Sequence, residues 1–149
     1  MEVRGGSCRL GLWHVHVWWC GDVIHRVRFA TTGIAGTVPA AIRQYCAGAV
    51  VDLSALDTIA CEGEAVAARI YRAVRGVPYG RTATYGQVAH DVGTFPRVVG
   101  RAMANNPTPL VVPCHRIVAA DGIGGFSPAL EIKELLLAME KKGIRKGAR

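Results

Sequence analysis

Hydrophobic and polar residues alternate along residues 10–29, where "LGLWHVHVWW" is followed by the turn "CGD" and by "VIHRVRF". Such alternation is typical of strands with one buried face, and a short glycine-containing turn between two such runs is a hairpin signal. We therefore predict a β-hairpin in which one face, carrying Trp13, Val15, Val17 and Trp19, contributes to a core, and the face carrying the histidines does not.

The period changes after residue 37. In "TVPAAIRQYCAGA" the residues Ile42, Tyr45, Cys46 and Ala49 recur at helical spacing, and Pro39 stands near the start, which predicts a helix. The segment "VVDLSAL" that follows predicts a strand. With the hairpin, these elements indicate a small α+β unit over residues 1–56.

Helical periodicity returns with an apolar stripe made of Val66, Ile70, Ala73, Val74 and Val77. Thr84 and Gln87 then form a T-x-x-Q capping box at the start of a short helix that Gly93 ends. A helix from Pro96 to Asn105 follows after "GTFP". Two short helices joined by a few residues containing a glycine predict a helix-turn-helix.

The last third of the chain contains "PLVVPCHRIVAADG", in which "LVV" and "RIVA" predict short extended runs around Pro-Cys-His. Ser127-Pro128 predicts the start of a final helix, whose apolar stripe of Ile132, Leu135, Leu136 and Met139 ends before Gly143. We expect "KKGIRKGAR" to form a frayed basic tail.

The composition of the chain limits the classes of binding partner and the cell compartment that we expect. The chain of 149 residues is 50% hydrophobic, as a folded domain requires, and its net charge of +7 favours a polyanion such as nucleic acid. No C-x-x-C pair and an odd number of cysteines argue against a secreted disulfide framework, although Cys8 and Cys20 could be oxidised as a pair. Without an apolar run of about 18 residues or the pattern of a signal peptide, we expect an intracellular, cytoplasmic protein.

Cys114 is the candidate nucleophile. A thiol needs a base or a positive environment to react at neutral pH, and His115 with Arg116 offers both. Neighbours on a strand point to opposite faces, so His115 reaches the sulfur only if the backbone turns there or a water bridges them. Taken alone, the Cys-His pair favours a structural cysteine.

Glu140 is a second candidate because it borders the inward stripe of the last helix, four residues after Leu136. A carboxylate in the last turn opposes the helix dipole by about 0.3 to 1 kcal/mol. Spacing alone favours a solvated Glu140 beside Lys141 over one that orients His115.

The helix over residues 96–105 has an unusual outward face, formed by Arg97, Gly100, Arg101 and Ala104. A helix about 10 Å wide enters a minor groove about 6 Å wide only where its contact face carries small side chains. Taken alone, Gly100 could equally be a helix-packing contact.

Four segments, "PYGRTATYGQVA", "PRVVGRAMANNP", "PLVVPCHRIVAADG" and "GGFSPALEIKELLLAME", together resemble the O6-alkylguanine-DNA alkyltransferases, or methylated-DNA–protein-cysteine methyltransferases. The resemblance covers residues 62–142. It implies an α+β protein with an N-terminal α/β, ribonuclease-H-like domain over residues 1–56. A mainly helical, winged helix-turn-helix-like domain that carries the DNA-binding surface and the active-site cysteine is implied for residues 57–149.

The resemblance implies DNA repair by direct reversal, in which the alkyl group of O6-alkylguanine passes irreversibly and once to Cys114. His115 is then the base, acting through a water and oriented by Glu140. Asn106 braces the turn before the cysteine, and Tyr85 assists the departing guanine. No cofactor is implied.

The remaining implied roles concern DNA, bound as a duplex through its minor groove without sequence specificity and by a monomer. Arg97 fills the space of the extruded nucleotide, and Ser127 helps to hold the base. The other residues expected to contact DNA are Thr84, Gly100, Arg101 and Ala104.

The sequence departs from the family pattern at two points. Phe126 stands where a tyrosine is frequent, and the loop before it is one residue shorter than in some relatives. Some relatives hold zinc in the N-terminal domain, but His14, His16, His25, Cys8 and Cys20 lack a ligand spacing, so we expect no metal.

Three other functions are alternatives to that of an alkyltransferase. A Cys-His hydrolase has no use for the basic helix and needs an oxyanion hole, and a plain helix-turn-helix protein leaves the Cys-His-Glu set unused. An alkyltransferase-like damage sensor is the nearest alternative, but such sensors lack the cysteine present here as Cys114.

Overall fold

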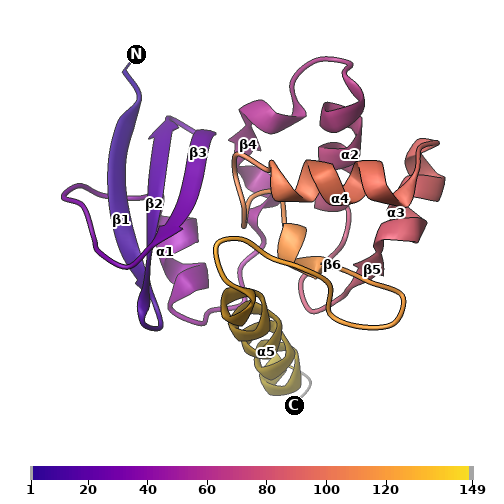
Figure 1. Ribbon diagram of the computed structural model, residues 1–149. Helices are drawn as coiled ribbons and strands as arrows, with labels where there is room; N and C mark the ends of the chain where they lie inside the picture. The colour runs from indigo at the N-terminus through magenta and orange to yellow at the C-terminus, as the bar shows by residue number, and fades with distance from the viewer. Residues whose placement is uncertain (1, 148–149) are drawn as a thin grey trace.

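An antiparallel sheet opens the fold, formed by β1 (Arg4–Leu10), β2 (Trp13–Cys20) and β3 (Val23–Ala30) (Figure 1). The computed structural model describes residues 2–147. A fourth strand, β4 (Asp57–Thr58), lies parallel to β3, so the order is β1-β2-β3-β4. The predicted hairpin is confirmed. β1 was not predicted from the sequence, because it holds two adjacent glycines and little alternation.

The first helix, α1 (Ala40–Cys46), packs on the sheet through Ile42, Tyr45 and Cys46, as predicted. The strand predicted for residues 50–56 is wrong, because a 3-10 turn occupies Leu53–Ala55. The Asp52 carboxylate accepts a hydrogen bond of 2.9 Å from the Ser54 N–H. This side chain satisfies the backbone locally and favours a turn over an extended run.

Three helices follow: α2 (Val66–Arg75), α3 (Tyr85–Val92) and α4 (Pro96–Ala104). A 3-10 turn at Ile59–Cys61 leads into α2. The predicted capping box is present at α3, where the Gln87 N–H donates to Thr84 Oγ1 at 3.1 Å and the Thr84 N–H donates to Gln87 Oε1 at 2.8 Å. Gly93 ends α3 with a φ of 82°, in the left-handed region that suits glycine.

The segment before the last helix bends more than the sequence predicts. The run "LVV" is not extended, because Val112 forms an isolated bridge with Pro109 and a 3-10 turn follows at Cys114–Arg116. Only β6 (Ile117–Val118) of "RIVA" is a strand, and it pairs in parallel with β5 (Ala83–Thr84).

The last helix, α5 (Leu130–Gly147), starts two residues after Pro128 and continues through Gly143. A Cβ atom at Gly143 would lie 2.5 Å from the Tyr79 hydroxyl, so this glycine allows a close contact and does not end the helix. The expected frayed tail is therefore wrong up to Gly147, and residues 148–149 lie outside the described part of the chain.

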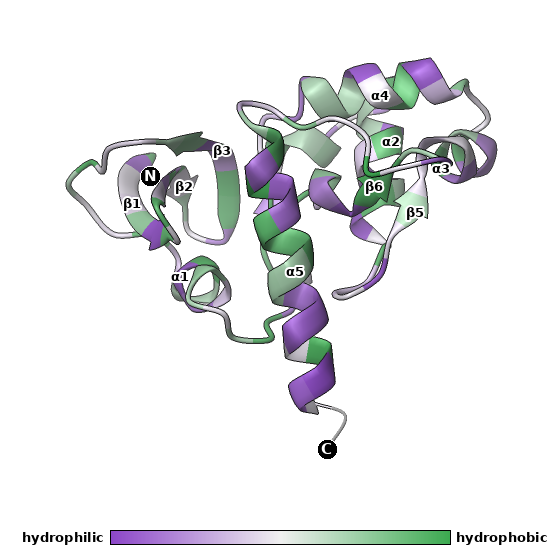
Figure 2. Ribbon diagram, turned by 60° about the horizontal axis from the view of Figure 1, so that its bottom comes forward, coloured by the Kyte–Doolittle hydropathy of each residue, from purple (hydrophilic) through white to green (hydrophobic). Residues whose placement is uncertain are grey.

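The chain has two apolar cores, and α5 contributes to the first of them. One lies between the sheet, α1 and the first half of α5, where Ile132 and Leu136 are fully buried. The other lies between α2, α3 and α4 and includes Val112 and Ile117. Figure 2 shows α5 beside both parts, with its hydrophilic C-terminal end directed away from α4. Among residues 2–147, none of the helices combines the length and the apolar character that crossing a membrane requires.

Candidate active site

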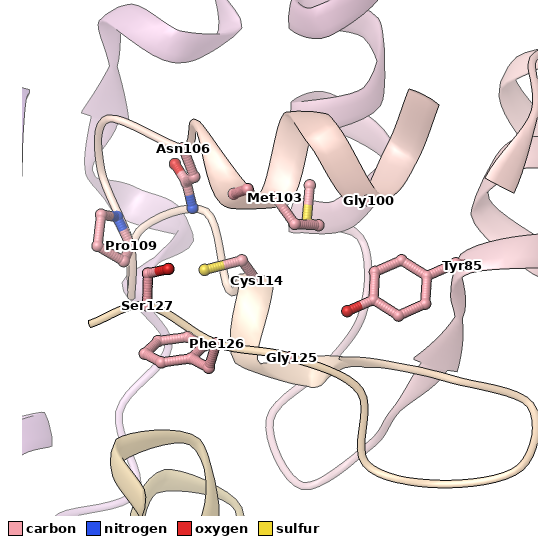
Figure 3. Close-up of a pocket in the computed structure, with 10 residues that line it drawn as sticks. Tyr85, Gly100, Met103, Asn106, Pro109, Cys114, Gly125, Phe126 and Ser127 are labelled. Carbon is pink, nitrogen blue, oxygen red and sulfur yellow. The ribbon is translucent and has the colours of Figure 1, made fainter. Parts of the chain in front are cut away.

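A cavity of about 250 Å³, which we call the Cys114 cavity, lies between α4, the start of α3, the turn at Cys114 and the loop before α5. Figure 3 shows the Tyr85 hydroxyl directed into it from the side opposite Asn106 and Pro109. The lining residues are Tyr85, Gly100, Met103, Ala104, Asn106, Pro109, Cys114, Gly125, Phe126 and Ser127. Five of the predicted site residues outside the His-Glu pair thus surround one space with Cys114: Tyr85, Gly100, Ala104, Asn106 and Ser127.

The backbone turns at Cys114. Such a turn is one of the two conditions under which we expected His115 to reach the sulfur. The Cys114 N–H donates to the Val112 carbonyl at 2.7 Å, and the Arg116 N–H donates to the Pro113 carbonyl at 2.9 Å. Burial raises the pKa of the Cys114 thiol to about 11, against the opposing effects of an Asn106 hydrogen bond and the Lys133 charge. The sulfur is therefore a neutral thiol at pH 7.

Asn106 braces the turn that precedes Cys114, in the position expected of it. Its Nδ2 donates to the Val112 carbonyl at 2.9 Å, and its Oδ1 accepts from the Thr108 N–H at 3.0 Å. Between these two anchors, Leu110 is buried with a φ of 76°. A left-handed conformation at a non-glycine residue costs about 1 to 3 kcal/mol, and it persists only where neighbours enforce it.

Glu140 is buried, with an exposed fraction of 1%, and lies at the centre of a polar cluster that we call the Glu140 cluster. His115 Nε2 lies 2.6 Å from Glu140 Oε2, and the Tyr45 hydroxyl donates to the same oxygen at 2.5 Å. Arg116 Nε donates to Oε1 at 2.9 Å, as does the Gly80 N–H. The interpretation of Glu140 as a solvated residue is wrong.

Electrostatics fix the charge of this cluster. Burial opposes ionisation of Glu140, but hydrogen bonds from His115 and Arg116 outweigh it and hold the carboxyl pKa far below its usual value. Burial also lowers the pKa of His115, with Glu140 acting in the opposite sense. The cluster is therefore a carboxylate with an arginine and a neutral imidazole.

The two nitrogens of His115 have different surroundings. Nε2 faces Glu140, so we assign the ring proton to that nitrogen. Nδ1 is buried and has no hydrogen-bond partner among residues 2–147. The lone pair of Nδ1 is thus the one on this ring that can accept a proton.

Two residues that support the site, Tyr45 and Lys133, were not predicted from the sequence. Tyr45 lies 95 residues from Glu140 and was interpreted only as part of a buried helix stripe. Lys133 is fully buried in α5, and its Nζ donates to the carbonyls of Ile117 at 2.6 Å and Gly125 at 3.0 Å. No local signal marks either residue, because both roles depend on partners distant in the chain.

The outward face of α4 carries the predicted small and basic residues. Arg97, Arg101 and Ala104 are exposed, and a Cβ atom added at Gly100 would meet no atom within 4 Å. Gly100 is therefore not a helix-packing contact. Thr84 uses its hydroxyl to cap α3 and is only partly exposed.

The N-terminal cysteines do not form the pair that the sequence suggested. Cys8 lies opposite Val15, five residues along β2 from Cys20, which is a separation of roughly 16 Å at strand rise. A disulfide needs Cα atoms within about 7 Å, so a Cys8–Cys20 bond is excluded in this fold. Cys8 instead contacts Cys46. No three His, Cys, Asp or Glu side chains are grouped as metal ligands anywhere in residues 2–147.

The second half of the chain is similar in sequence to known proteins. Residues 65–142 match the family model for the DNA-binding domain of 6-O-methylguanine DNA methyltransferase. Over 77 residues the chain is 49% identical to a methylated-DNA–protein-cysteine methyltransferase of Metallosphaera sedula, covering 52% of this chain and 49% of that protein. A Methanopyrus kandleri protein of the same name is 54% identical over 67 residues, covering 45% of this chain and 51% of its own length.

The match to these curated relatives therefore spans about half of their length. The solved structure of Mycobacterium tuberculosis O6-methylguanine methyltransferase superposes with a TM-score of 0.75 at 24% identity, covering 95% of this chain and 94% of that one. This likeness establishes that the two chains share a mixed α/β fold.

Proposed function

Because the chain belongs to the 6-O-methylguanine DNA methyltransferase family, we propose that it repairs DNA by direct reversal, moving the alkyl group of O6-alkylguanine onto its own Cys114. The observation that carries this proposal is the position of the Cys114 thiol. It lines a cavity with the Tyr85 hydroxyl, and its neighbour His115 is held by a buried Glu140 carboxylate.

We assign residues 57–149 to a winged helix-turn-helix-like domain that binds DNA. Residues 1–56 form, in this proposal, a ribonuclease-H-like α/β domain. In this proposal the protein binds DNA as a monomer, and α4 enters the minor groove of the duplex. Support comes from the small side chains of Gly100 and Ala104 and from exposed Arg97 and Arg101. Contacts to phosphates are independent of sequence, as a protein that must act at any guanine requires.

The lesion must leave the base stack before it can react. The O6 atom lies inside the duplex, and extruding a nucleotide costs a few kcal/mol, least where pairing is already damaged. The Cys114 cavity, at about 250 Å³, suits one small planar group. Arg97, exposed at the start of α4, occupies the vacated space and offsets part of this cost, while Ser127 at the cavity lining holds the base.

The reaction is a single displacement at the alkyl carbon. The Cys114 proton passes to His115 Nδ1 through a water, a sulfur–carbon bond forms and the carbon–oxygen bond breaks. The electron pair of the broken carbon–oxygen bond stays with the guanine, whose ring nitrogen takes up a proton from water, and the thiol proton held by His115 returns to water. Burial raises the pKa of Tyr85, so this residue acts chiefly as a hydrogen-bond donor to the departing guanine.

The thioether product has no leaving group that water can displace, so each molecule reacts once. Glu140 holds the His115 ring in the orientation that presents Nδ1, and its charge stabilises the imidazolium formed during the transfer. Arg116 and Tyr45 in turn hold Glu140.

Intact mass spectrometry tests the proposal. The protein is incubated with a duplex that contains one O6-methylguanine, and the wild type is compared with Cys114→Ser and with Cys61→Ser, which alters another free cysteine. We expect a gain of one methyl group in the wild type and in Cys61→Ser, mapped to Cys114, and no gain in Cys114→Ser. A wild type that binds the lesion without gaining mass would make the protein a damage sensor.

A further inference from the structure

A second hollow, of about 650 Å³, lies between β3 and the segment that follows α4. We call it the β3 groove. It shares Ala104, Asn106, Pro109 and Ser127 with the lining of the Cys114 cavity, so the two spaces are adjacent. Its other lining residues are His25, Arg26, Val27, Arg28, Phe29, Asn105, Pro107 and Pro128.

The β3 groove is basic. Arg26 and Arg28 line it and are exposed, His25 lines it and is half-buried, and none of its lining residues is acidic. Within residues 2–147, neither arginine forms a salt bridge of 4.0 Å or less. The guanidinium groups are therefore available to an anionic ligand.

Two contacts fix β3 relative to the Cys114 cavity. The Val27 N–H donates to the Pro107 carbonyl at 2.9 Å, just after α4. The Phe29 ring packs on Phe126, with centroids 5.7 Å apart, and Phe126 lines the Cys114 cavity. The groove and the cavity thus keep a constant relative position, and Figure 1 shows β3 next to the segment between α4 and β6.

We propose that the β3 groove binds the sugar-phosphate backbone of the DNA strand that carries the extruded nucleotide. This inference rests on the proposed function. A nucleotide in the Cys114 cavity stays covalently joined to its strand, and the phosphates on one side must pass the rim formed by Ala104, Asn106 and Ser127. Beyond that rim lie Arg26 and Arg28. Arginine forks match phosphate oxygens in charge and geometry.

The groove also gives the N-terminal sheet a part in DNA binding. Arg97 lies at the first turn of α4, and the β3 groove adjoins the last turn at Ala104. Basic side chains therefore flank the cavity opening from both ends of one helix. In this arrangement, basic side chains contact the DNA strand on both sides of the extruded nucleotide.

The salt dependence of DNA affinity tests the groove. Arg26→Ala/Arg28→Ala is compared with wild type on an unmodified duplex over a range of salt concentrations. The matched control, Lys141→Ala/Lys142→Ala, removes the same charge from exposed sites near the end of α5 that points away from α4 (Figure 2). Each phosphate contact contributes about 1 to the slope of log affinity against log salt, so we expect the slope to fall by about 2 in the groove variant. The control should keep the wild-type slope.

An unchanged slope in the groove variant, or an equal fall in the control, would overturn the proposal. Methyl transfer from the free O6-methylguanine base to Cys114 is measured in parallel. The groove variant should transfer at the wild-type rate, because the free base has no phosphate. If the wild type transfers no methyl group while the groove variant still loses slope, the proposed function fails and the groove remains a DNA contact.

Discussion

Cys114 and Glu140 are both buried ionisable residues that contact or adjoin His115, yet their pKa values move in opposite directions. Burial raises the pKa of Cys114 to about 11. At Glu140, donors from His115 and Arg116 overcome burial and lower the pKa. The Glu140 carboxylate is surrounded by hydrogen-bond donors, whereas the sulfur has Asn106 and the more distant charge of Lys133.

This difference shows how a reactive site can be stable and still be inert before its substrate arrives. The permanent charge sits on a residue that never reacts, and its partners hold it in a fixed orientation. Cys114, the acceptor in the proposed reaction, stays neutral, and a neutral thiol is a poor nucleophile toward oxidants and adventitious electrophiles. In that proposal, activation depends on proton transfer to His115 within a filled cavity.

Removing the Glu140 charge has the largest expected effect on this contrast. Glu140→Gln leaves Arg116 buried without its counterion, so we expect a loss of about 3 to 5 kcal/mol in the free energy of unfolding at pH 7. The rate of methyl transfer should fall by about a hundredfold or more, because His115 loses both its orientation and its charge partner. Urea unfolding and single-turnover kinetics measure the two effects.

The same variant tests the pH dependence. The pKa of Glu140 is lower in the folded chain than in the unfolded one, so the unfolded chain binds more protons in acid. Its contribution to stability is present above about pH 4.3 and is lost as the pH falls below that value. The variant should lack this part of the acid dependence. The control Glu131→Gln, at an exposed position in the same helix, should match wild type; equal stabilities for all three proteins at pH 7 would contradict the assignment.

A change on the thiol side should be smaller. Lys133 lowers the pKa of Cys114 and donates to the Gly125 carbonyl at the cavity edge. Lys133→Met keeps the length of the side chain but removes the charge, so the thiol pKa should rise. Each unit reduces the thiolate fraction at pH 7 about tenfold.

The rate at which iodoacetamide modifies Cys114, followed by peptide mapping, measures that change. We expect the rate at Cys114 to fall in Lys133→Met, while the rate at Cys61 in the same sample stays constant as an internal control. A faster reaction at Cys114 would mean that the variant opens the cavity and that the charge of Lys133 has little effect on the thiol.

A third change removes one hydroxyl from the Glu140 cluster and should affect stability less than removal of the Glu140 charge. Tyr45→Phe removes a hydrogen bond to the Glu140 carboxylate, which is worth about 1.5 to 3 kcal/mol when the acceptor is charged. Tyr79→Phe is the matched control, because the Tyr79 hydroxyl is buried and has no hydrogen-bond partner among the described residues. Thermal and urea unfolding should separate the two. Equal losses in both variants would show that Tyr45 contributes through its ring alone.

Much of the fold was predictable because its signals are local. The Thr84–Gln87 capping box and Gly93 define α3 within a few residues of sequence. The errors arose where a distant partner decides the structure. β1 is stabilised by pairing with β2, and the glycine at position 143 makes room for the Tyr79 hydroxyl inside a continuous helix.

The same distinction applies to the residues of the site: those with a local signal were predicted, and those that depend on a distant partner were not. The Pro-Cys-His segment made Cys114 and His115 candidates, the resemblance of four segments implied their roles, and the outward face of α4 was predicted from the spacing of Arg97, Gly100, Arg101 and Ala104. Glu140 was ambiguous, since a carboxylate at the border of an apolar stripe has the same spacing whether it is solvated or buried. Tyr45 could not be found, because its hydroxyl reaches Glu140 only through the packing of α1 near α5.

Helix α5 carries Ile132 and Leu136 into the N-terminal core and Glu140 into the cluster around His115. A cut at residue 56 would therefore yield two fragments that are each unfinished: one with an uncovered sheet, the other with a carboxylate lacking Tyr45. Neither fragment should react alone. In the proposed function, a covalent mark on Cys114 would therefore record that both halves of the chain are assembled around α5.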